Sequence, residues 1–264
     1  MRCFENIGST MKRIVHLSDL HFGRTNYATL DALQTFLKKQ TFDLIVVSGD
    51  LTQRSRKKQF LEAKEFLDSL PGPKFIVPGN HDIPLYKFWI RFFKPFKNFK
   101  SIIGRELEPI HIDDEIAVLG MNTISLWTSE GFFGSKRMSR LEKKLSELSD
   151  DLVKILVTHH PVPAHRLEKS GLQFDVFMSG HTHEASFSLA KIKNHKQHLK
   201  IQAGTSTSTR LRGVHLNSFN VIHINAPELS VERYSWNKES LNFVKDENAL
   251  FERLTHCWQL SSPK

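Results

Sequence analysis

One recurring pattern restricts what this chain can fold into: short apolar runs of strand length stop at clusters of Asp, Asn and His. The first three such runs are 13–17, 44–47 and 75–77, and each of the first two is followed by a segment whose apolar residues have helical spacing. Continuous apolar runs that alternate with helices are typical of α/β sheets covered on both faces. We therefore predict a β–α–β–α–β succession of this kind.

Polar side chains follow all three predicted strands. Asp19 and His21 follow the first, Asp50 the second, and Asn80 and His81 the third. Because residues two apart in extended backbone point the same way, Asp19 and His21 can converge on one cation. Each group alone is also typical of an ordinary polar turn. Three successive strands that end in possible metal ligands are improbable as turn chemistry, so the sequence favours a metal site at the carboxyl edge of the sheet.

The second half of the chain repeats this pattern twice. A buried-type strand over 153–157 is followed by His159, and a shorter run over 176–178 is followed by His181 and His183. The His-x-His spacing repeats the geometry of the first Asp-x-His pair. These three histidines extend the candidate site to both halves of the chain.

The remaining strand signals favour antiparallel or mixed pairing. A hairpin is predicted over 110–121, and strand-like runs follow at 201–203, 218–224 and 229–236. The segment 204–213 is rich in hydroxyls and holds two arginines. It is predicted to be a surface loop, with phosphate binding as the alternative.

Composition indicates the kind of partner and compartment. The 264 residues are 39% hydrophobic, and 37 Lys and Arg against 28 Asp and Glu give a net charge of +9. This excess favours anionic partners, nucleic acid among them, or only solubility. The two cysteines, Cys3 and Cys257, lack metal-type spacing and fit a reducing cytoplasm. No apolar run approaches the roughly 18 to 20 residues of a membrane span, so we expect a cytoplasmic protein.

Residues 83–104 form an unusual aromatic and basic insert. Phe and Trp recur at roughly helical intervals, with Lys and Arg between them and a break at Pro95. A helix packed on the core would explain the pattern. The alternatives are a substrate cap or a peripheral membrane contact through 85–100, which would bring the protein to the inner membrane face.

Taken together, the motifs resemble the calcineurin-like metallophosphoesterase family. They occur in the order Asp-x-His, Gly-Asp, Gly-Asn-His-Asp, His-His-Pro and Gly-His-x-His, between Asp19 and His183. The resemblance implies an α/β fold, a four-layer αββα sandwich of two mixed β-sheets flanked by helices. It would place a single domain over 12–236, after a flexible extension over 1–11 and before a C-terminal segment over 237–264.

The resemblance also implies two divalent cations and an enzyme that hydrolyses phosphoric esters. Oxygen and nitrogen ligands without thiolate suit Mn, Fe, Zn or Co. The first ion would be held by Asp19, His21, Asp50 and His183. The second would be held by Asn80, His159, His181 and the same Asp50. A hydroxide between the ions would attack phosphorus, and His81 would protonate the leaving group as general acid. His160 would be a structural neighbour.

Within the family the motifs look most like the class III cyclic-nucleotide phosphodiesterases, which implies a small phosphoester substrate. One alternative is a pyrophosphatase that cleaves UDP-2,3-diacylglucosamine in lipid A synthesis. The aromatic insert favours that branch, whereas His81, where its best-known members carry arginine, counts against it. We also consider a nuclease-like phosphodiesterase and a metal-binding scaffold without activity.

Overall fold

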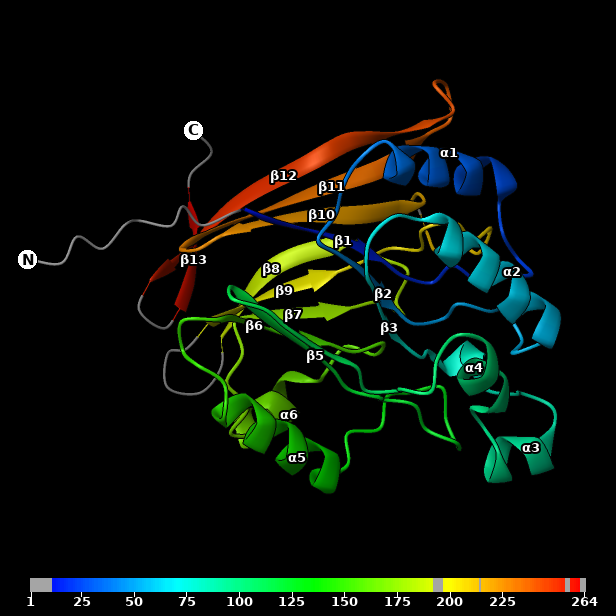
Figure 1. Cartoon of the computed structure of the whole chain (residues 1–264), viewed down its shortest axis with the longest axis horizontal. Helices are drawn as coiled ribbons and strands as arrows, with labels where there is room; N and C mark the ends of the chain where they lie inside the picture. Colours follow the sequence, from blue (N-terminus) through cyan, green and yellow to red (C-terminus); the bar gives the residue numbers. More distant parts are fainter. Residues whose placement is uncertain (1–10, 192–196, 214, 255–256, 262–264) are drawn as a thin grey trace, which may run out of the picture.

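The computed structural model describes residues 11–191, 197–213, 215–254 and 257–261. Two mixed β-sheets form its centre (Figure 1). The seven-stranded sheet has the order β13-β12-β11-β10-β1-β2-β3, and the six-stranded sheet the order β4-β5-β6-β7-β9-β8. Apart from Met11, the extension predicted over 1–11 lies outside the described residues.

The predicted β–α–β–α–β succession is present at the start of the chain. It consists of β1 (Lys12–Leu17), α1 (Tyr27–Lys38), β2 (Leu44–Ser48), α2 (Lys57–Ser69) and β3 (Lys74–Val77). Strands β1, β2 and β3 pair in parallel. Their carboxyl ends therefore meet at one edge of the seven-stranded sheet, as the sequence predicts.

The later elements complete both sheets and their outer layers. The second sheet is formed by β4 (Ile110–Ile112), β5 (Ile116–Gly120), β6 (Val153–Val157), β7 (Val176–Ser179), β8 (Ser186–Lys191) and β9 (Gln197–Gln202). The first sheet gains β10 (Ser218–Asn225), β11 (Glu228–Asn237), β12 (Asn242–Leu254) and β13 (Cys257–Ser261). The later helices are η1 (Asn80–Asp82), α3 (Phe88–Phe93), α4 (Lys97–Ile102), α5 (Ser135–Ser146) and α6 (Ala164–Lys169).

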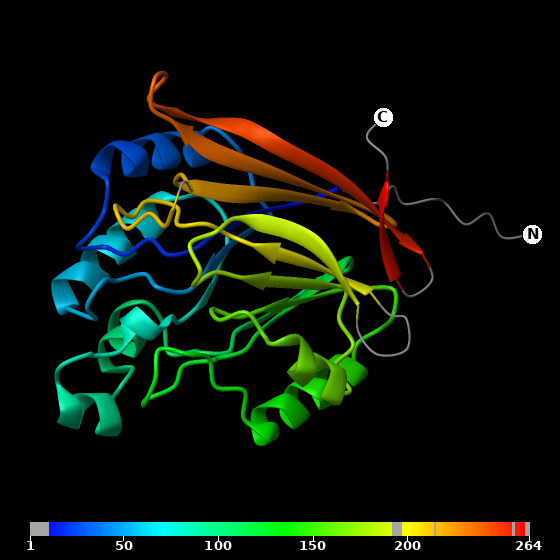
Figure 2. The ribbon, with the colours of Figure 1, turned by 180° about the vertical axis from the view of Figure 1, so that it is seen from behind.

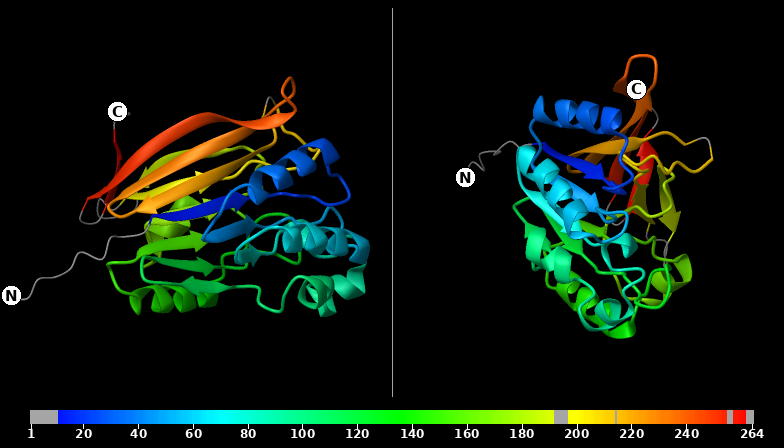
Figure 3. Two further views of the ribbon diagram at one scale, coloured as in Figure 1. Left: turned by 45° about the horizontal axis from the view of Figure 1, so that its top comes forward. Right: turned by 90° about the vertical axis from the view of Figure 1, so that its right-hand side faces the viewer.

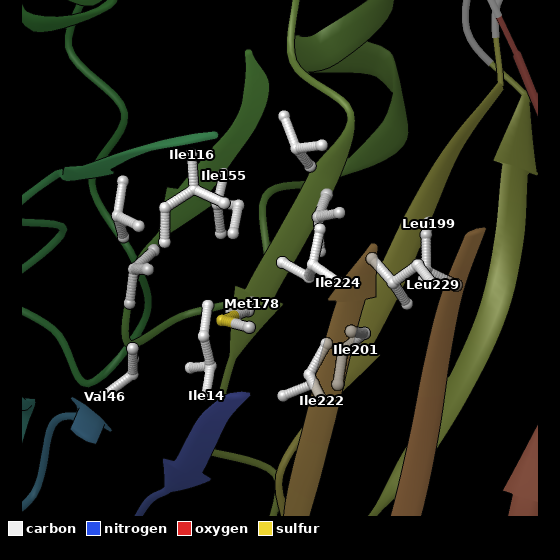
Figure 4. Packing of buried hydrophobic residues seen from close by; sticks show 14 of the residues in the cluster. Ile14, Val46, Ile116, Ile155, Met178, Leu199, Ile201, Ile222, Ile224 and Leu229 are labelled. Atoms are coloured by element: carbon white, nitrogen blue, oxygen red, sulfur yellow. The ribbon is translucent and has the colours of Figure 1, made fainter. Parts of the chain in front are cut away.

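Three apolar layers hold these elements together. Because side chains alternate along a strand, Val46 of β2 faces the second sheet while Ile45 and Val47 face the helices. Figure 4 shows side chains of both sheets gathered in the central layer, among them Ile14 and Met178.

Helices cover the outer faces of both sheets. The buried apolar residues of α1, α2 and α4 belong to one outer cluster, and those of α5 and α6 to the other. Figures 2 and 3 show how the helices lie around the two sheets. The four-layer αββα sandwich predicted from the family resemblance is therefore confirmed.

The aromatic insert is divided into two parts with different environments. Helix α3 ends at Phe93 and α4 begins at Lys97, because Pro95 cannot continue the helical hydrogen bonds. Phe99 of α4 is buried against Phe60 of α2, whereas no residue of α3 is buried. The core-helix interpretation thus applies to α4 alone. None of the helices in the described ranges is long and apolar enough to cross a membrane.

The C-terminal segment adds two strands for which the sequence gives little signal. Strand β12 pairs with β11 along almost its whole length, and β13 pairs with β12. Most residues of β12 are exposed or half-buried, so the strand carries no continuous apolar run. Strand β8 is likewise not predicted from the sequence.

His198 of β9 provides a test of this packing. Its ring is buried 5.0 Å from the ring of Phe174, and burial, with Lys200 nearby, lowers its pKa to about 4. Since this histidine then binds more protons in the unfolded chain between about pH 4 and 6.5, it lowers the free energy of unfolding as the pH falls through that window.

We predict that His198→Leu removes up to about 3 kcal/mol of this acid destabilisation. Urea unfolding of both proteins at a series of pH values measures it. His165→Leu, on the exposed side of α6, should leave the pH dependence unchanged. Parallel stability curves for His198→Leu and the unmodified protein would contradict the prediction.

Candidate metal centre

The loops that follow five strands meet at one point between the two sheets. The backbone N–H of His181, after β7, donates to Asp19 Oδ2, after β1, at 2.9 Å, which ties the two sheets together there. All seven predicted metal ligands lie around this point: Asp19, His21, Asp50, Asn80, His159, His181 and His183.

A first group of three ligand atoms comes from the loops after β1 and β7. His183 Nε2 lies 3.1 Å from Asp19 Oδ1 and 3.1 Å from His21 Nε2. His21 Nε2 lies 3.6 Å from Asp19 Oδ1, a buried oxygen that has no hydrogen-bond partner among the described residues. Such converging lone pairs fit a cation.

A second group comes from η1 and the loops after β6 and β7. Asn80 Oδ1 lies 3.0 Å from His159 Nε2 and 3.1 Å from His181 Nδ1. The two ring nitrogens lie 3.3 Å apart. A neutral amide and two imidazoles can hold a second ion without adding negative charge.

Asp50 lies between the two groups. Its Oδ2 is 3.7 Å from His21 Nε2 in the first and 3.5 Å from His159 Nε2 in the second. Its Oδ1 accepts the backbone N–H of His81 at 2.8 Å. A single oxygen therefore faces both groups.

Backbone carbonyls orient two of the histidine rings. Nδ1 of His159 donates to the carbonyl of Ser48 at 2.8 Å, and Nδ1 of His183 donates to the carbonyl of Arg210 at 2.7 Å. Each bond leaves Nε2 unprotonated in the neutral ring and turned to the site, as metal binding requires.

His160 is placed differently from its neighbour His159. Its Nδ1 is 2.9 Å from the hydroxyl of Thr123, and its Nε2 donates to the carbonyl of Ser129 at 2.9 Å. Burial, followed by the charge of His159, lowers its pKa to about 3. Both ring nitrogens are occupied, so His160 supports the site and offers it no free ligand atom.

Electrostatic interactions inside the site shift the pKa values of its acidic and basic groups in opposite directions. Burial raises the pKa of Asp19, but the neighbouring imidazoles of His183 and His21 outweigh burial and hold that pKa well below its usual range. Burial lowers the pKa of His159, but the charge of Asp50 outweighs it and raises that pKa to about 9. The carboxylates are thus kept ionised, which is the form that binds cations.

Backbone strain is concentrated at the predicted ligands. Among the described residues, seven that are not glycine have positive φ, and five of them are Asp19, His21, Asp50, His181 and His183. This left-handed conformation is unfavourable for side chains with a Cβ, and it clusters at functional sites. The strain turns the ligand side chains towards one another.

Two glycines permit the close approach of the loops after β2 and β3. Gly49 has φ +94°, so it makes the tight turn before Asp50. Gly79 has an ordinary φ of −105°. It is needed because a Cβ there would lie 2.1 Å from Asp50 Oδ1.

Asp82 fastens the same two loops. Its carboxylate accepts backbone N–H groups from Thr52 at 2.9 Å and from Gly79 at 2.9 Å. Burial, together with the charge of Asp50, raises its pKa to about 6. Asp82 therefore fixes the loop after β3 against the loop after β2.

His81 lies beside the ligand groups rather than among them. Nδ1 donates to the carbonyl of Gln53 at 2.9 Å, while Nε2 faces the guanidinium of Arg210 at 3.3 Å. The pKa of His81 is lowered by burial, the main cause, and also by the charges of His21 and Arg210. Arg210 was not predicted from the sequence to belong to the site. The sequence signal that could have indicated this role is the presence of two arginines in the segment 204–213.

The hydroxyl-rich segment over 204–213, predicted to be a surface loop, is divided: 204–208 is buried, whereas 209–213 is exposed as predicted. The hydroxyl of Thr205 donates to the carbonyl of Asp19 at 2.7 Å, and that of Thr207 to the carbonyl of Leu20 at 2.9 Å. These carbonyls belong to the strained loop after β1 and have no strand partner there. The hydroxyls therefore satisfy the backbone that carries two predicted ligands.

Comparison with known proteins agrees with this arrangement. A sequence model described as calcineurin-like phosphoesterase matches residues 12–185. A probable glycerophosphodiester phosphodiesterase of Arcobacter nitrofigilis is 26% identical over 56% of this chain and 57% of its own. A 3',5'-cyclic adenosine monophosphate phosphodiesterase of Escherichia coli K12 is 24% identical over 60% of this chain and 58% of its own. The chain spans less than two thirds of the length of these relatives.

The fold is also similar to solved structures. A purple acid phosphatase from yellow lupin seeds superposes with a TM-score of 0.70 at 12% identity, over 93% of this chain and 54% of that one. Vacuolar Protein Sorting 29 from Cryptosporidium parvum superposes with a TM-score of 0.52 at 13% identity, over 92% of this chain and 99% of that one. These likenesses concern the fold alone.

The position of Asp50 yields a prediction about metal content. We expect Asp50→Asn to lower the number of bound ions below two and to lower activity together with it, because the neutral amide offers each group a weaker ligand. Elemental analysis after loading with Mn²⁺ measures the content. Asp114→Asn, at an exposed hairpin residue, is the control and should retain full occupancy. Two tightly bound ions in Asp50→Asn would contradict a shared ligand.

Proposed function

The chain belongs to the calcineurin-like phosphoesterase family, and from this premise we propose that it is a phosphodiesterase that uses two divalent cations. The observation that carries the proposal is the position of Asp50 Oδ2, within 3.7 Å of His21 Nε2 and 3.5 Å of His159 Nε2. Asp19, His21 and His183 would hold one ion with Asp50. Asn80, His159 and His181 would hold the other with the same carboxylate.

The protein's own residues prepare the site for this chemistry. When bound, the cations supply Lewis-acid charge for the phosphoryl oxygens and a lowered pKa for the attacking water. The carbonyls of Ser48 and Arg210 hold two imidazoles in the tautomer that binds metal. The buried hydroxyls of Thr205 and Thr207 keep the first ligand loop rigid.

His81 is proposed to donate the proton that the leaving oxygen needs. Because Nδ1 donates to the carbonyl of Gln53, Nε2 carries a proton only when the ring is the imidazolium, and from that form Nε2 would donate to the leaving oxygen. The backbone N–H of the same residue donates to Asp50 Oδ1 at 2.8 Å, and His81→Ala keeps this N–H. The general-acid role can therefore be tested without removing the support of Asp50.

Arg210 is proposed to bind a non-bridging oxygen of the phosphodiester. Its guanidinium is exposed and lies 3.3 Å from His81 Nε2 and 3.5 Å from Gln53 Oε1. No carboxylate pairs with it within the described ranges. An unpaired guanidinium beside the proton donor is suited to orient an anionic substrate.

The proposed substrate is a small phosphodiester, with 3',5'-cyclic nucleotides as the first candidates. Two relatives are named for different substrates, a cyclic nucleotide and a glycerophosphodiester, and both contain a phosphodiester bond. One Mn²⁺-loaded preparation should be tested against both, together with UDP-2,3-diacylglucosamine, single-stranded DNA and a phosphomonoester. Hydrolysis of the monoester alone would contradict the proposal.

His81→Ala gives a test that depends on the leaving group. We expect metal content near normal and a loss of kcat far greater for an alkyl diester than for a nitrophenyl diester, since nitrophenolate leaves without a proton. His165→Ala, at an exposed histidine of α6, should change neither rate. Equal losses on the two substrates would argue against proton donation by His81.

Arg210→Gln gives a test of substrate binding. We expect kcat/KM for a diester to fall roughly tenfold or more, because a charge-assisted hydrogen bond is lost. Arg210→Lys should recover part of the loss, and Arg105→Gln, at an exposed arginine of another loop, should cause none. The backbone carbonyl that holds His183 is kept in both Arg210 variants. Unchanged kinetics in Arg210→Gln would exclude the contact.

A further inference from the structure

A cluster of exposed aromatic side chains lies on α3 and on the loop between β5 and α5. We call it the aromatic knob, and it consists of Phe88, Trp89, Phe92, Phe93 and Trp127. Trp89, Phe93 and Trp127 are 72%, 73% and 79% exposed. Helix α3 lies at the periphery of the fold, with α4 between α3 and α2 (Figure 1). Contiguous exposed apolar surface of this kind marks an interaction site.

The rings of the knob are packed on one another. The centroid of Phe92 is 4.5 Å from that of Phe88 and 4.5 Å from that of Trp127, and Trp89 stacks on Phe93 at 5.9 Å. The rings from α3 and from the loop thus form one apolar surface.

Arg91 fixes the knob in place. Its guanidinium donates to the carbonyls of Leu126 at 2.6 Å, Pro84 at 3.1 Å and Ser125 at 3.5 Å. These bonds join α3 to the loop that carries Trp127, and to the loop that leaves η1. The apolar surface is therefore preformed.

A strongly basic cavity lies beside the knob. Its volume is about 540 Å³, and among its lining residues there is no Asp or Glu. Six basic side chains line it: Arg54, Arg56, Lys57, Lys87, Lys94 and Lys97. Over the described part of the chain none of the six forms an ion pair with a carboxylate. Their positive charge is thus available to an anionic partner.

We propose that the aromatic knob and the basic cavity together bind the surface of an anionic phospholipid bilayer. Trp and Phe rings enter the interface between headgroups and acyl chains, and neighbouring Lys and Arg attract anionic headgroups. The net charge of +9 acts in the same direction. Contact with lipid would cover the apolar surface and neutralise the unpaired cations at once.

Two features favour a bilayer over single-stranded nucleic acid. Leu85 and Ile90, which are 48% and 39% exposed, lie among the aromatic residues, and aliphatic side chains offer no face on which a base can stack. Trp89 and Phe93 are nearly parallel, with 15° between their planes, so each already occupies one face of the other. A continuous apolar surface surrounded by cations fits lipid better.

The binding surface is joined to the candidate metal centre. Arg54 and Pro84, which line the cavity, belong to the loops that carry Asp50 and His81. The loop of Trp127 continues to Ser129, whose carbonyl accepts the Nε2 proton of His160. Contact at this corner would bring the centre close to the bilayer. The proposal does not depend on which phosphoester the centre hydrolyses.

Tryptophan fluorescence of the full chain, measured without substrate, tests the proposal. Trp236 and Trp258 are buried, so a change in emission on adding vesicles reports mainly Trp89 and Trp127. We expect a blue shift with phosphatidylcholine vesicles that contain phosphatidylglycerol, and little or none with phosphatidylcholine alone. An unchanged emission with both, or an equal shift with both, would overturn the proposal.

Sedimentation with the same vesicles compares matched variants. We expect Trp89→Ala with Phe93→Ala, and separately Lys87→Glu with Lys94→Glu, to weaken binding at least tenfold. Tyr27→Ala, at an exposed aromatic residue of α1, and Lys38→Glu with Lys238→Glu are the controls and should bind normally. Retained binding in the first two variants would overturn the assignment of the surface.

Two other partners could bind the aromatic knob, and each would give a different experimental result. A lipid-free dimer that Trp89→Ala with Phe93→Ala dissociates would show that a second copy of the chain covers the knob. A shift in emission with a single-stranded oligonucleotide but not with anionic vesicles would show nucleic acid binding. Either result would contradict the bilayer as the partner of this surface.

Discussion

The structure depends on keeping the buried carboxylate of Asp50 ionised between two groups of histidines. Water cannot solvate this charge, so the protein must compensate it from every side. The N–H of His81 binds one oxygen, and His21 and His159 face the other. Much of the local backbone follows from this requirement: Gly79 has no side chain because Asp50 occupies the space, and Asp50 itself adopts positive φ. Divalent cations would complete the compensation that the protein begins.

The two sheets supply the rigidity that such a centre needs. Apolar side chains fill the layer between the sheets and the two outer layers under the helices, and this burial offsets the strain at the ligand residues. The loops themselves are tied by buried polar contacts. Asp82 joins the loops after β2 and β3, and Thr205 and Thr207 hold the carbonyls of the loop after β1. The ligand atoms are therefore positioned before any ion binds.

The sequence predicts those parts of the site that depend on local pattern. Asp19, His21 and Asp50 follow apolar runs, and parallel pairing then brings them to one edge. Features that depend on distant contacts were missed. Arg210 reaches His81 only because a buried loop folds back over the first strand, and the length of β12 is hidden by its largely exposed side chains. The insert was predicted as an amphipathic segment with a break at Pro95, but the pattern did not indicate that Phe99 after the break is buried while Trp89 before it is exposed.

The central claim is that two cations share the Asp50 carboxylate. Anomalous X-ray diffraction from crystals of the full chain soaked in Mn²⁺ tests it most directly. We predict two strong anomalous peaks, one beside Asp19, His21 and His183 and one beside Asn80, His159 and His181, with Asp50 Oδ2 between them. A single peak, or two peaks of which only one contacts Asp50, would contradict this claim.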